Sequence, residues 1–317
     1  MSTASYNCPC CCGGPLKFSG ESGKLECTAC GNNYEPEALE MMTPEESIDE
    51  ITFANDAKRF DTGEAGMRAY FCKNCGAELM ADETAAAECP YCGSPTILPD
   101  RIEGGVKPEK VIPFVVTKEQ AQKQFEDYFK GKKLLPNVFL NSRNRISEMR
   151  RLYIPYWLFS CDACADMVYD AEKVHTEQKG EWEITRTKHY LVRRRGGMRF
   201  ENIPVDGSVK MDDKLTESLE PYDLSAAIPF QSAVLAGAMA DHADADCDAC
   251  EKRAVERSVE QTMLDTVRDY DTVSERSRRI IAERGNATPA LLPVWLMMTV
   301  KEGKTYTFAV NGQTGKL

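Results

Sequence analysis

Two pairs of cysteines with the spacing Cys-x-x-Cys carry the clearest chemistry in this sequence. Cys72 and Cys75 form the first pair, Cys89 and Cys92 form the second, and thirteen residues separate the pairs. A glycine follows each pair, and glycine readily adopts the positive φ that lets backbone amides turn towards the sulfurs. Two such knuckles facing each other offer four thiolates at the corners of a tetrahedron, the arrangement that Zn²⁺ prefers. The spacing therefore predicts a four-cysteine zinc ribbon whose intervening residues form a hairpin.

An earlier copy of this motif lies near the N-terminus. Cys27 and Cys30, followed by glycine, form one knuckle, and Cys8 and Cys11 form a pair that ends fifteen residues before it. Cys12 is an alternative to Cys11, because glycine follows it. Each ribbon is too short to build a hydrophobic core of its own, so we expect two structural zinc ions to stabilise them.

Two identical Cys-Asp-Ala-Cys tetrapeptides allow a third zinc site. Cys161 and Cys164 lie in the first tetrapeptide, and Cys247 and Cys250 lie in the second. No glycine follows either pair, and spacing alone does not show that the pairs meet in the fold. Buried or half-buried free thiols are the alternative interpretation, and we favour it.

Composition indicates a globular protein of a reducing compartment. A chain of 317 residues suggests about two domains with the ribbons as additions. The first thirty residues lack the apolar segment of a signal peptide, so the fourteen cysteines do not indicate an exported disulfide protein. No run of about eighteen apolar residues occurs, so we expect a cytoplasmic chain that spans no membrane.

The negative charge is concentrated around the ribbons. The net charge is −11, and residues 1–100 contain six Lys and Arg against seventeen Asp and Glu, whereas the remainder is balanced. Binding to nucleic acid needs basic side chains, so the acidic ribbons favour protein partners. A nucleic-acid-binding ribbon protein of replication or transcription is the alternative function.

Basic side chains cluster in the second domain, which follows the ribbons. We interpret them as a solvated sheet face whose positive charge is offset by interleaved glutamates. The functional alternative is a binding surface for an acidic partner, an anionic membrane surface or the chain's own acidic ribbons. The cluster residues are Arg143, Arg145, Arg150, Arg151, Arg186, Lys188, Arg193, Arg194, Arg195, Arg199, Arg276, Arg278 and Arg279.

No motif indicates catalysis. The sequence contains no phosphate-binding loop, no dinucleotide-binding glycine pattern and no His-Glu-x-x-His. A four-cysteine zinc site is closed, so its metal has no position for water or substrate. We therefore expect a non-enzymatic protein.

Hydrophobic patterning predicts an α+β fold with antiparallel sheets. A linker helix should start at Thr43 and end near Phe60, and a second helix should start at Thr117 with Gln120 as its capping partner. A hairpin tip is expected at residues 195–197. Further helices are expected at 142–151 and 246–267, and strands at 111–116, 152–159, 167–174, 182–193, 198–203, 270–284 and 305–310.

Similar short segments in the two halves of the second domain predict an internal duplication. The segment 227–230 resembles 111–114, and the segment 291–296 resembles 153–158. The predicted organisation is zinc ribbon 1 at 1–40, a helical linker at 41–66, zinc ribbon 2 at 67–100, and α+β repeat units at 101–207 and 208–317.

The chain resembles a family of bacterial tandem zinc-ribbon proteins. These proteins are described as containing transcription-factor-IIB-type zinc ribbons, and are often mislabelled as primosomal-helicase-like. The stretches that carry the resemblance begin at Cys27, Tyr70, Glu88, Gly131, Tyr153, Leu291 and Tyr306.

The resemblance implies an accessory of envelope stress. It suggests phage-shock-protein-A-like or band-7 proteins as partners, and a zinc-dependent adaptor role near the membrane. Many similar proteins continue into membrane helices, so the resemblance also implies membrane association through a tail absent from this chain. The two Cys-Asp-Ala-Cys pairs do not match what the family implies.

Overall fold

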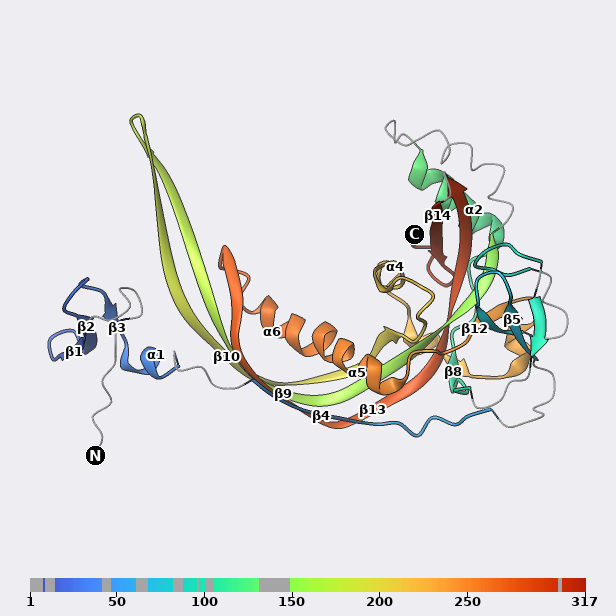
Figure 1. Ribbon diagram of the computed structural model, residues 1–317, viewed down its shortest axis with the longest axis horizontal. Coiled ribbons are helices and arrows are strands. Elements are labelled where there is room, and N and C mark those ends of the chain that lie inside the picture. Colours follow the sequence, from blue (N-terminus) through green and yellow to red (C-terminus); the bar gives the residue numbers. More distant parts are fainter. Residues whose placement is uncertain are drawn as a thin grey trace. The chain divides into compact units, whose positions relative to one another are not determined.

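The computed structural model is an α+β protein, mostly sheet with few helices (Figure 1). It describes residues 8, 15–41, 47–60, 68–81, 88–95, 97–100, 105–130, 149–301 and 304–317. The chain packs as two compact units. Unit 1 comprises Met1–Ile51, Asp162–Met198 and Val259–Glu283, and unit 2 comprises Thr52–Cys161, Arg199–Ser258 and Arg284–Leu317. The five predicted segments stay a prediction, because packing does not show which segments fold alone.

Unit 1 begins with a small antiparallel sheet. Its strands β1 (Leu16–Ser19), β2 (Lys24–Cys27) and β3 (Asn33–Tyr34) follow one another in space as in sequence. Helix α1 (Pro36–Met41) comes soon after β3. The β1–β2 hairpin lies where the ribbon spacing predicts one, between the two halves of the first cysteine motif.

Two long strands, β9 and β10, form a hairpin (Figure 1). β9 covers Arg150–Lys179 and β10 covers Trp182–Asp206, so the four separate strands predicted here merge into two. The predicted hairpin tip at 195–197 is wrong, because these residues lie within β10. Gly180, with a φ of 67°, makes the turn instead, since a tight hairpin turn needs the positive φ that glycine tolerates.

Strands from distant parts of the sequence build the main sheet. The strand order is β11-β8-β13-β9-β12-β6-β5-β7, with β10 beside β9, and β4 and β14 beside β13. The bounds are β4 Ile48–Ala54, β5 Arg68–Cys72, β6 Glu78–Ala81, β7 Ile97–Asp100, β8 Lys110–Val111, β11 Ile228–Pro229, β12 Met239–Asp241, β13 Thr272–Lys301 and β14 Lys304–Asn311.

Strand β12 joins the second cysteine motif to the rest of unit 2. It pairs antiparallel with β6, where Ala240 lies opposite Met80, and parallel with β9, where Ala240 lies opposite Tyr153. Residues 152–159 of β9 are all buried. Ribbon 2 is therefore part of the main sheet and not an appendage on it.

The predicted helix after Thr117 is confirmed as α2 (Lys118–Phe129). The Thr117 hydroxyl accepts a hydrogen bond from the Gln120 amide at 3.3 Å, and the Gln120 side chain accepts one from the Thr117 amide at 2.8 Å. This reciprocal pair is the capping box that the sequence predicts. Ala121 and Phe125 face the core, where both are buried.

The remaining helices are short. The predicted helix at 246–267 is confirmed as α5 (Cys247–Val255), a π-helical turn (Glu256–Glu260) and α6 (Gln261–Asp265). Helix α4 is Asp213–Ser218, and 3₁₀ turns cover Leu224–Ala226 and Ser232–Leu235. Among the described residues, no helix is long and apolar enough to cross a bilayer.

The predicted linker helix between Thr43 and Phe60 is wrong where the structure describes it. Residues 42–46 lie outside the described residues, and β4 occupies Ile48–Ala54. Pairing with β13 overrides the local helix signal, and Gly285 permits the close approach. A Cβ atom at Gly285 would lie 2.5 Å from the Thr52 carbonyl oxygen and 2.6 Å from the Phe53 ring.

The remaining expectations meet the structure with different outcomes. The strand expected at 111–116 ends at Val111, because Pro113 has no amide to donate to a ladder. The helix expected at 142–151 is wrong at its end, where Arg150 starts β9, and 142–148 lie outside the described residues. The strands at 270–284 and 305–310 are confirmed in β13 and β14. The duplication stays a prediction, although Val111 and Ile228, which lie in the similar segments 111–114 and 227–230, pair with each other.

Candidate metal centre

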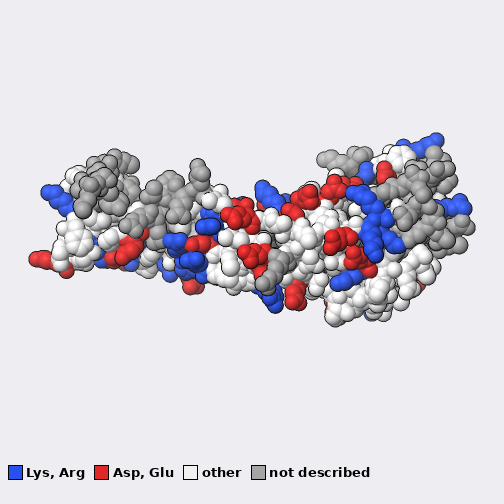
Figure 2. Space-filling view, turned by 90° about the horizontal axis from the view of Figure 1, so that it is seen from below, with Lys and Arg blue, Asp and Glu red and all other residues white. Residues whose placement is uncertain are grey.

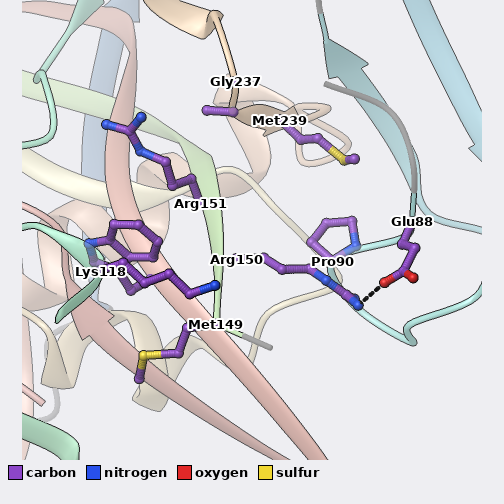
Figure 3. Close-up of a pocket in the computed structure, with 10 residues that line it drawn as sticks. Glu88, Pro90, Lys118, Met149, Arg150, Arg151, Gly237 and Met239 are labelled. Carbon is purple, nitrogen blue, oxygen red and sulfur yellow. Dashed lines mark hydrogen bonds and ion pairs between the residues drawn. The ribbon is translucent and has the colours of Figure 1, made fainter. Parts of the chain in front are cut away.

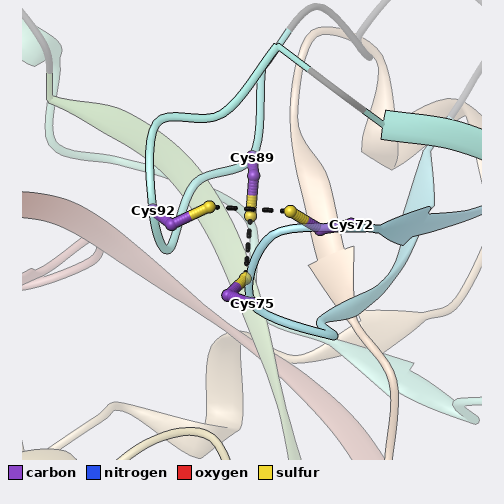
Figure 4. A group of neighbouring side chains, drawn as sticks. All are labelled: Cys72, Cys75, Cys89 and Cys92. Carbon is purple, nitrogen blue, oxygen red and sulfur yellow. Dashed lines mark hydrogen bonds between the residues drawn. The ribbon is translucent and has the colours of Figure 1, made fainter.

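The four cysteines of ribbon 2 converge on one point (Figure 4). Their sulfurs all lie within 4.8 Å of one another. The Sγ atoms of Cys72 and Cys92 are 3.5 Å apart, and those of Cys75 and Cys89 are 3.6 Å apart. Disulfide sulfurs would be about 2.05 Å apart, so these are not bonded pairs. A tetrahedral site with Zn–S bonds of about 2.3 Å has sulfur–sulfur edges of about 3.8 Å, close to the distances seen here.

Backbone hydrogen bonds shape both knuckles in the same way. The Gly76 amide donates to the Cys72 carbonyl at 2.8 Å, and the Gly93 amide donates to the Cys89 carbonyl at 3.0 Å. Both glycines have positive φ, 70° and 72°. The glycine that follows each pair in the sequence is thus the residue that closes the turn around the sulfurs.

The local electrostatics set how readily each thiol ionises. Burial raises the pKa of Cys75 and of Cys89. Burial also opposes ionisation of Cys92, but a hydrogen bond with Asn74 and contacts with other cysteines bring its pKa down to about 7. Thiolate is the form that binds metal, so Zn²⁺ binding must displace protons from the buried thiols.

A buried polar cluster supports the second knuckle. The Tyr91 hydroxyl donates to Asp241 Oδ2 at 2.5 Å, and the Ser208 hydroxyl donates to the same oxygen at 2.5 Å. Burial raises the pKa of Asp241 to about 6. Because Asp241 belongs to β12, this cluster links the ribbon to the neighbouring strand by polar as well as apolar contacts.

Two cations hold the knuckle backbones. Arg150 Nη1 donates to the Cys89 carbonyl at 2.6 Å, and its guanidinium also pairs with Glu88. Lys210 Nζ donates to the Cys75 carbonyl at 3.0 Å. Both bonds end on main-chain oxygens of ligand residues, so they orient the knuckles without competing for the sulfurs.

The ribbon cysteines also belong to the apolar core. Cys72 and Cys89 are fully buried and lie in one cluster with Leu79, Leu152 and Tyr156. The neighbours therefore come from β6 and β9 together. A zinc ion in this position would stabilise the sheet of unit 2 and not only the ribbon.

Ribbon 1 brings three of its predicted ligands together. The sulfurs of Cys8, Cys27 and Cys30 lie within 4.8 Å of one another, and those of Cys8 and Cys30 are 3.5 Å apart. Cys11 and Cys12, the two alternatives for the fourth ligand, lie outside the described residues. The three placed cysteines fit a second metal site of the same kind.

The cysteines of the two Cys-Asp-Ala-Cys tetrapeptides occupy different elements. Cys161 is buried and Cys164 exposed on β9, whereas Cys247 and Cys250 are both buried in α5. Only Cys247 belongs to a described group of close metal ligands, together with two carboxylates of its own helix. Burial raises the pKa of Cys247 to about 12 and of Cys250 to about 11, which favours protonated thiols. The third zinc site stays a prediction.

Sequence reasoning missed most of the groups that support the ribbon. Asp241 lies 150 residues beyond Tyr91 in the sequence, and no local pattern connects them. Lys210 and Ser208 carry no motif either. Arg150 stood out only as one of a cluster of basic residues, and its bond to a knuckle carbonyl could not be read from its neighbours.

Comparison with known proteins supplies one clear relative. A protein of Bacillus subtilis strain 168, described as uncharacterized protein YdjG, is 35% identical over 316 residues, which is 99% of this chain and 88% of the relative. The chain belongs to the YdjG family. No family model matches it, and no solved structure matches it.

The YdjG match spans both cysteine motifs and both units. The description of YdjG states no ligand and no activity. Membership of the YdjG family therefore adds a relative that matches almost the whole of this chain, but no chemistry. The wider zinc-ribbon family suggested by the sequence stays a prediction. The chemistry of the YdjG family must be argued from the site itself.

Proposed function

We propose that this chain is a non-enzymatic adaptor that zinc holds in shape and that works through protein–protein contacts. The observation that supports this most directly is the closed geometry of the ribbon 2 site, where four cysteine sulfurs face one another. A metal with four thiolate ligands has no position for water or substrate. Its role is to stabilise the fold, with one zinc ion in each ribbon.

Charge favours a protein partner over nucleic acid. On the face shown in Figure 2, basic and acidic side chains are interspersed over the described surface. A phosphate backbone would have to compete with carboxylates for the arginines of the long strands. The pairs are Arg186 with Glu177, Arg193 with Asp166, Arg276 with Asp170, and Arg278 with Asp49 and Glu260.

The turn of the β9–β10 hairpin offers a contact point. Trp182 is the first residue of β10 and is 77% exposed. Exposed tryptophans at such positions are frequent energetic centres of protein interfaces. We include in the proposal the partners that the family resemblance suggests, phage-shock-protein-A-like or band-7 proteins, and a place at the cytoplasmic face of the membrane.

The test measures binding of the full chain to a purified phage-shock-protein-A-like protein by sedimentation velocity. Trp182→Ser should weaken binding about thirtyfold, the effect of losing a hot spot of about 2 kcal/mol. Val209→Ser is the matched control, because Val209 is an apolar side chain of similar exposure, 72%, in unit 2. Equal losses for both variants, or no complex with any candidate partner, would contradict the adaptor role.

The alternative function is tested in parallel. Fluorescence anisotropy with short duplex DNA and single-stranded RNA should show no binding at micromolar protein concentration and physiological salt. Micromolar binding with a steep negative dependence on salt would instead favour a nucleic-acid-binding ribbon protein. Native mass spectrometry of the same preparation should count two zinc ions per chain.

A further inference from the structure

A pocket of about 340 Å³ lies beside the second knuckle of ribbon 2 (Figure 3). We call it the Arg151 pocket and define it by Glu88, Lys118, Arg150, Arg151, Met239 and Trp295. Its volume is at the lower end of the range of about 300–1,000 Å³ that is usual for small-molecule sites. All of these residues belong to unit 2.

The Arg151 pocket is positively charged on a chain that is otherwise acidic. Among the described residues, three cationic side chains line it, Lys118, Arg150 and Arg151, and Glu88 is the one carboxylate. Figure 3 shows that carboxylate directed at Arg150, with which it forms an ion pair. Cations thus outnumber carboxylates among the described lining residues, although the whole chain carries −11. Such a local reversal of sign attracts anions.

Aromatic rings hold the guanidinium of Arg151. Its central carbon lies 4.6 Å from the centre of the Phe114 ring and 5.7 Å from that of Trp295. The Trp295 indole is itself fixed, because its Nε1 donates to the Val116 carbonyl at 2.9 Å. Within the part of the chain that the structure describes, Arg151 has no ion-pair partner. A stacked guanidinium keeps its hydrogen-bond donors at its edge free for a planar anion.

The walls of the pocket are apolar. Met149, Ala238, Met239 and Trp295 each expose at most 7% of their surface, and Pro90 completes the lining on the ribbon side. A fully hydrated inorganic anion gains nothing from such walls, whereas an apolar group does. The lining therefore suits a ligand that combines an apolar body with an anionic end.

We propose that the Arg151 pocket binds a small organic anion, an apolar group that ends in a carboxylate. Arg151 and Lys118 would receive the carboxylate, and the methionines and Trp295 would cover the apolar body. Two sources carry this chemistry, the C-terminal residue of a peptide and a free aliphatic acid. The proposal does not depend on the adaptor function or on the partner suggested above.

The test uses the full chain as purified, in a buffer without phosphate. N-acetyl-leucine stands for a peptide C-terminus, hexanoate for a free acid, and N-acetyl-leucinamide for the same body without charge. Binding is measured by calorimetry and by the indole N–H signals of the three tryptophans in two-dimensional NMR. We expect at least one of the two acids to bind and to move the Trp295 signal alone, and the better binder identifies the source.

Variants connect the binding to named residues. Arg151→Met keeps the apolar stem and removes the charge, so it should weaken binding of the acid about tenfold, as the loss of one charge-assisted contact does. Arg186→Met is the matched control, because Arg186 is an exposed arginine of β10 outside the pocket. It should leave the affinity unchanged.

Several outcomes would overturn the proposal. Equal binding of N-acetyl-leucine and its amide would show that charge plays no part. Inorganic phosphate that moves the Trp295 signal as strongly as either acid would show that the apolar body plays none. Failure of both acids to bind at millimolar concentration, or equal losses in Arg151→Met and Arg186→Met, would show that the pocket is not the site.

Discussion

Loss of zinc from ribbon 2 should loosen the sheet of unit 2 and not only the ribbon. The perturbation is Cys75→Ser, which removes one ligand at a half-buried position. A structural zinc ion contributes on the order of 10 kcal/mol to folding. Without zinc, the ribbon would lose the binding free energy that keeps its two cysteine turns together. The effect on the sheet depends on how much apolar burial is lost when the ribbon separates from it.

The cost follows from four side chains of the ribbon. Tyr70, Leu79, Met80 and Tyr91 are at most 9% exposed, and all pack in clusters shared with the rest of unit 2. At about 2 kcal/mol for each large apolar side chain, detachment would forfeit about 8 kcal/mol of burial. That is a large part of the 5–15 kcal/mol by which a typical domain is stable. Ribbon and sheet should therefore lose structure together.

Hydrogen exchange read by mass spectrometry separates the two outcomes. In Cys75→Ser, exchange should accelerate in the ribbon strands and also in Met239–Asp241 and in residues 152–159. Cys164→Ser is the control, because Cys164 is exposed on β9 and belongs to no described ligand group. Faster exchange confined to residues 68–100, with β12 and β9 unchanged, would refute the argument that the ribbon is part of the core.

Three further predictions each rest on one or two residues. Asp241→Asn should flatten the pH dependence of urea unfolding between about pH 4 and 6, because burial raises the pKa of Asp241 from 3.8 to about 6. The folded wild type binds more protons than the unfolded chain in that window, so its free energy of unfolding falls as pH rises, by on the order of 3 kcal/mol. An Asp241→Asn variant whose free energy of unfolding falls with pH as steeply as that of the wild type would contradict this. Gly285→Ala should lower the urea midpoint by the equivalent of about 1–3 kcal/mol, because its Cβ would meet β4. Gly196→Ala is the control and should change stability by less than about 0.5 kcal/mol, because a Cβ atom there meets nothing within 4 Å. A larger loss of stability in Gly196→Ala than in Gly285→Ala would refute the placement of β4 beside β13 and of Gly196 within β10. The double variant Cys161→Ser with Cys164→Ser should keep two zinc ions per chain in native mass spectrometry, and loss of one ion would establish a third site.

Local chemistry was predictable from the sequence. The turn around each cysteine pair depends on a glycine that is adjacent in the chain, so spacing alone indicates it. The capping box of Thr117 and Gln120 is equally local, and both contacts are present. In each case the residues that decide the structure lie within four positions of one another.

Long-range pairing was not predictable in the same way. The start of the predicted linker helix has good local signals, yet β4 forms because β13 offers a ladder more than two hundred residues later. The glycines at 196 and 197 indicate a turn, but β10 stays paired with β9 through them, and the chain reverses at Gly180. The residues that support the metal centre were not predictable for the same reason, because only the sheet brings Asp241 to Tyr91.

The position of β12 between β6 and β9 has a consequence for synthesis of the chain. β6 ends at Ala81, and its neighbour in the sheet, β12, ends at Asp241, so 160 residues must be added before the pair can form. At roughly 5–20 residues per second, the nascent ribbon waits about 8–32 s with an unpaired strand edge and with Leu79 and Met80 uncovered. The four cysteines of ribbon 2 are all translated by then, so the nascent ribbon could bind zinc and fold on the ribosome. The later strands would then pair with the free edge of β6 in an already folded ribbon. Scarcity of zinc would then act first on newly made chains, and finished molecules would be affected later.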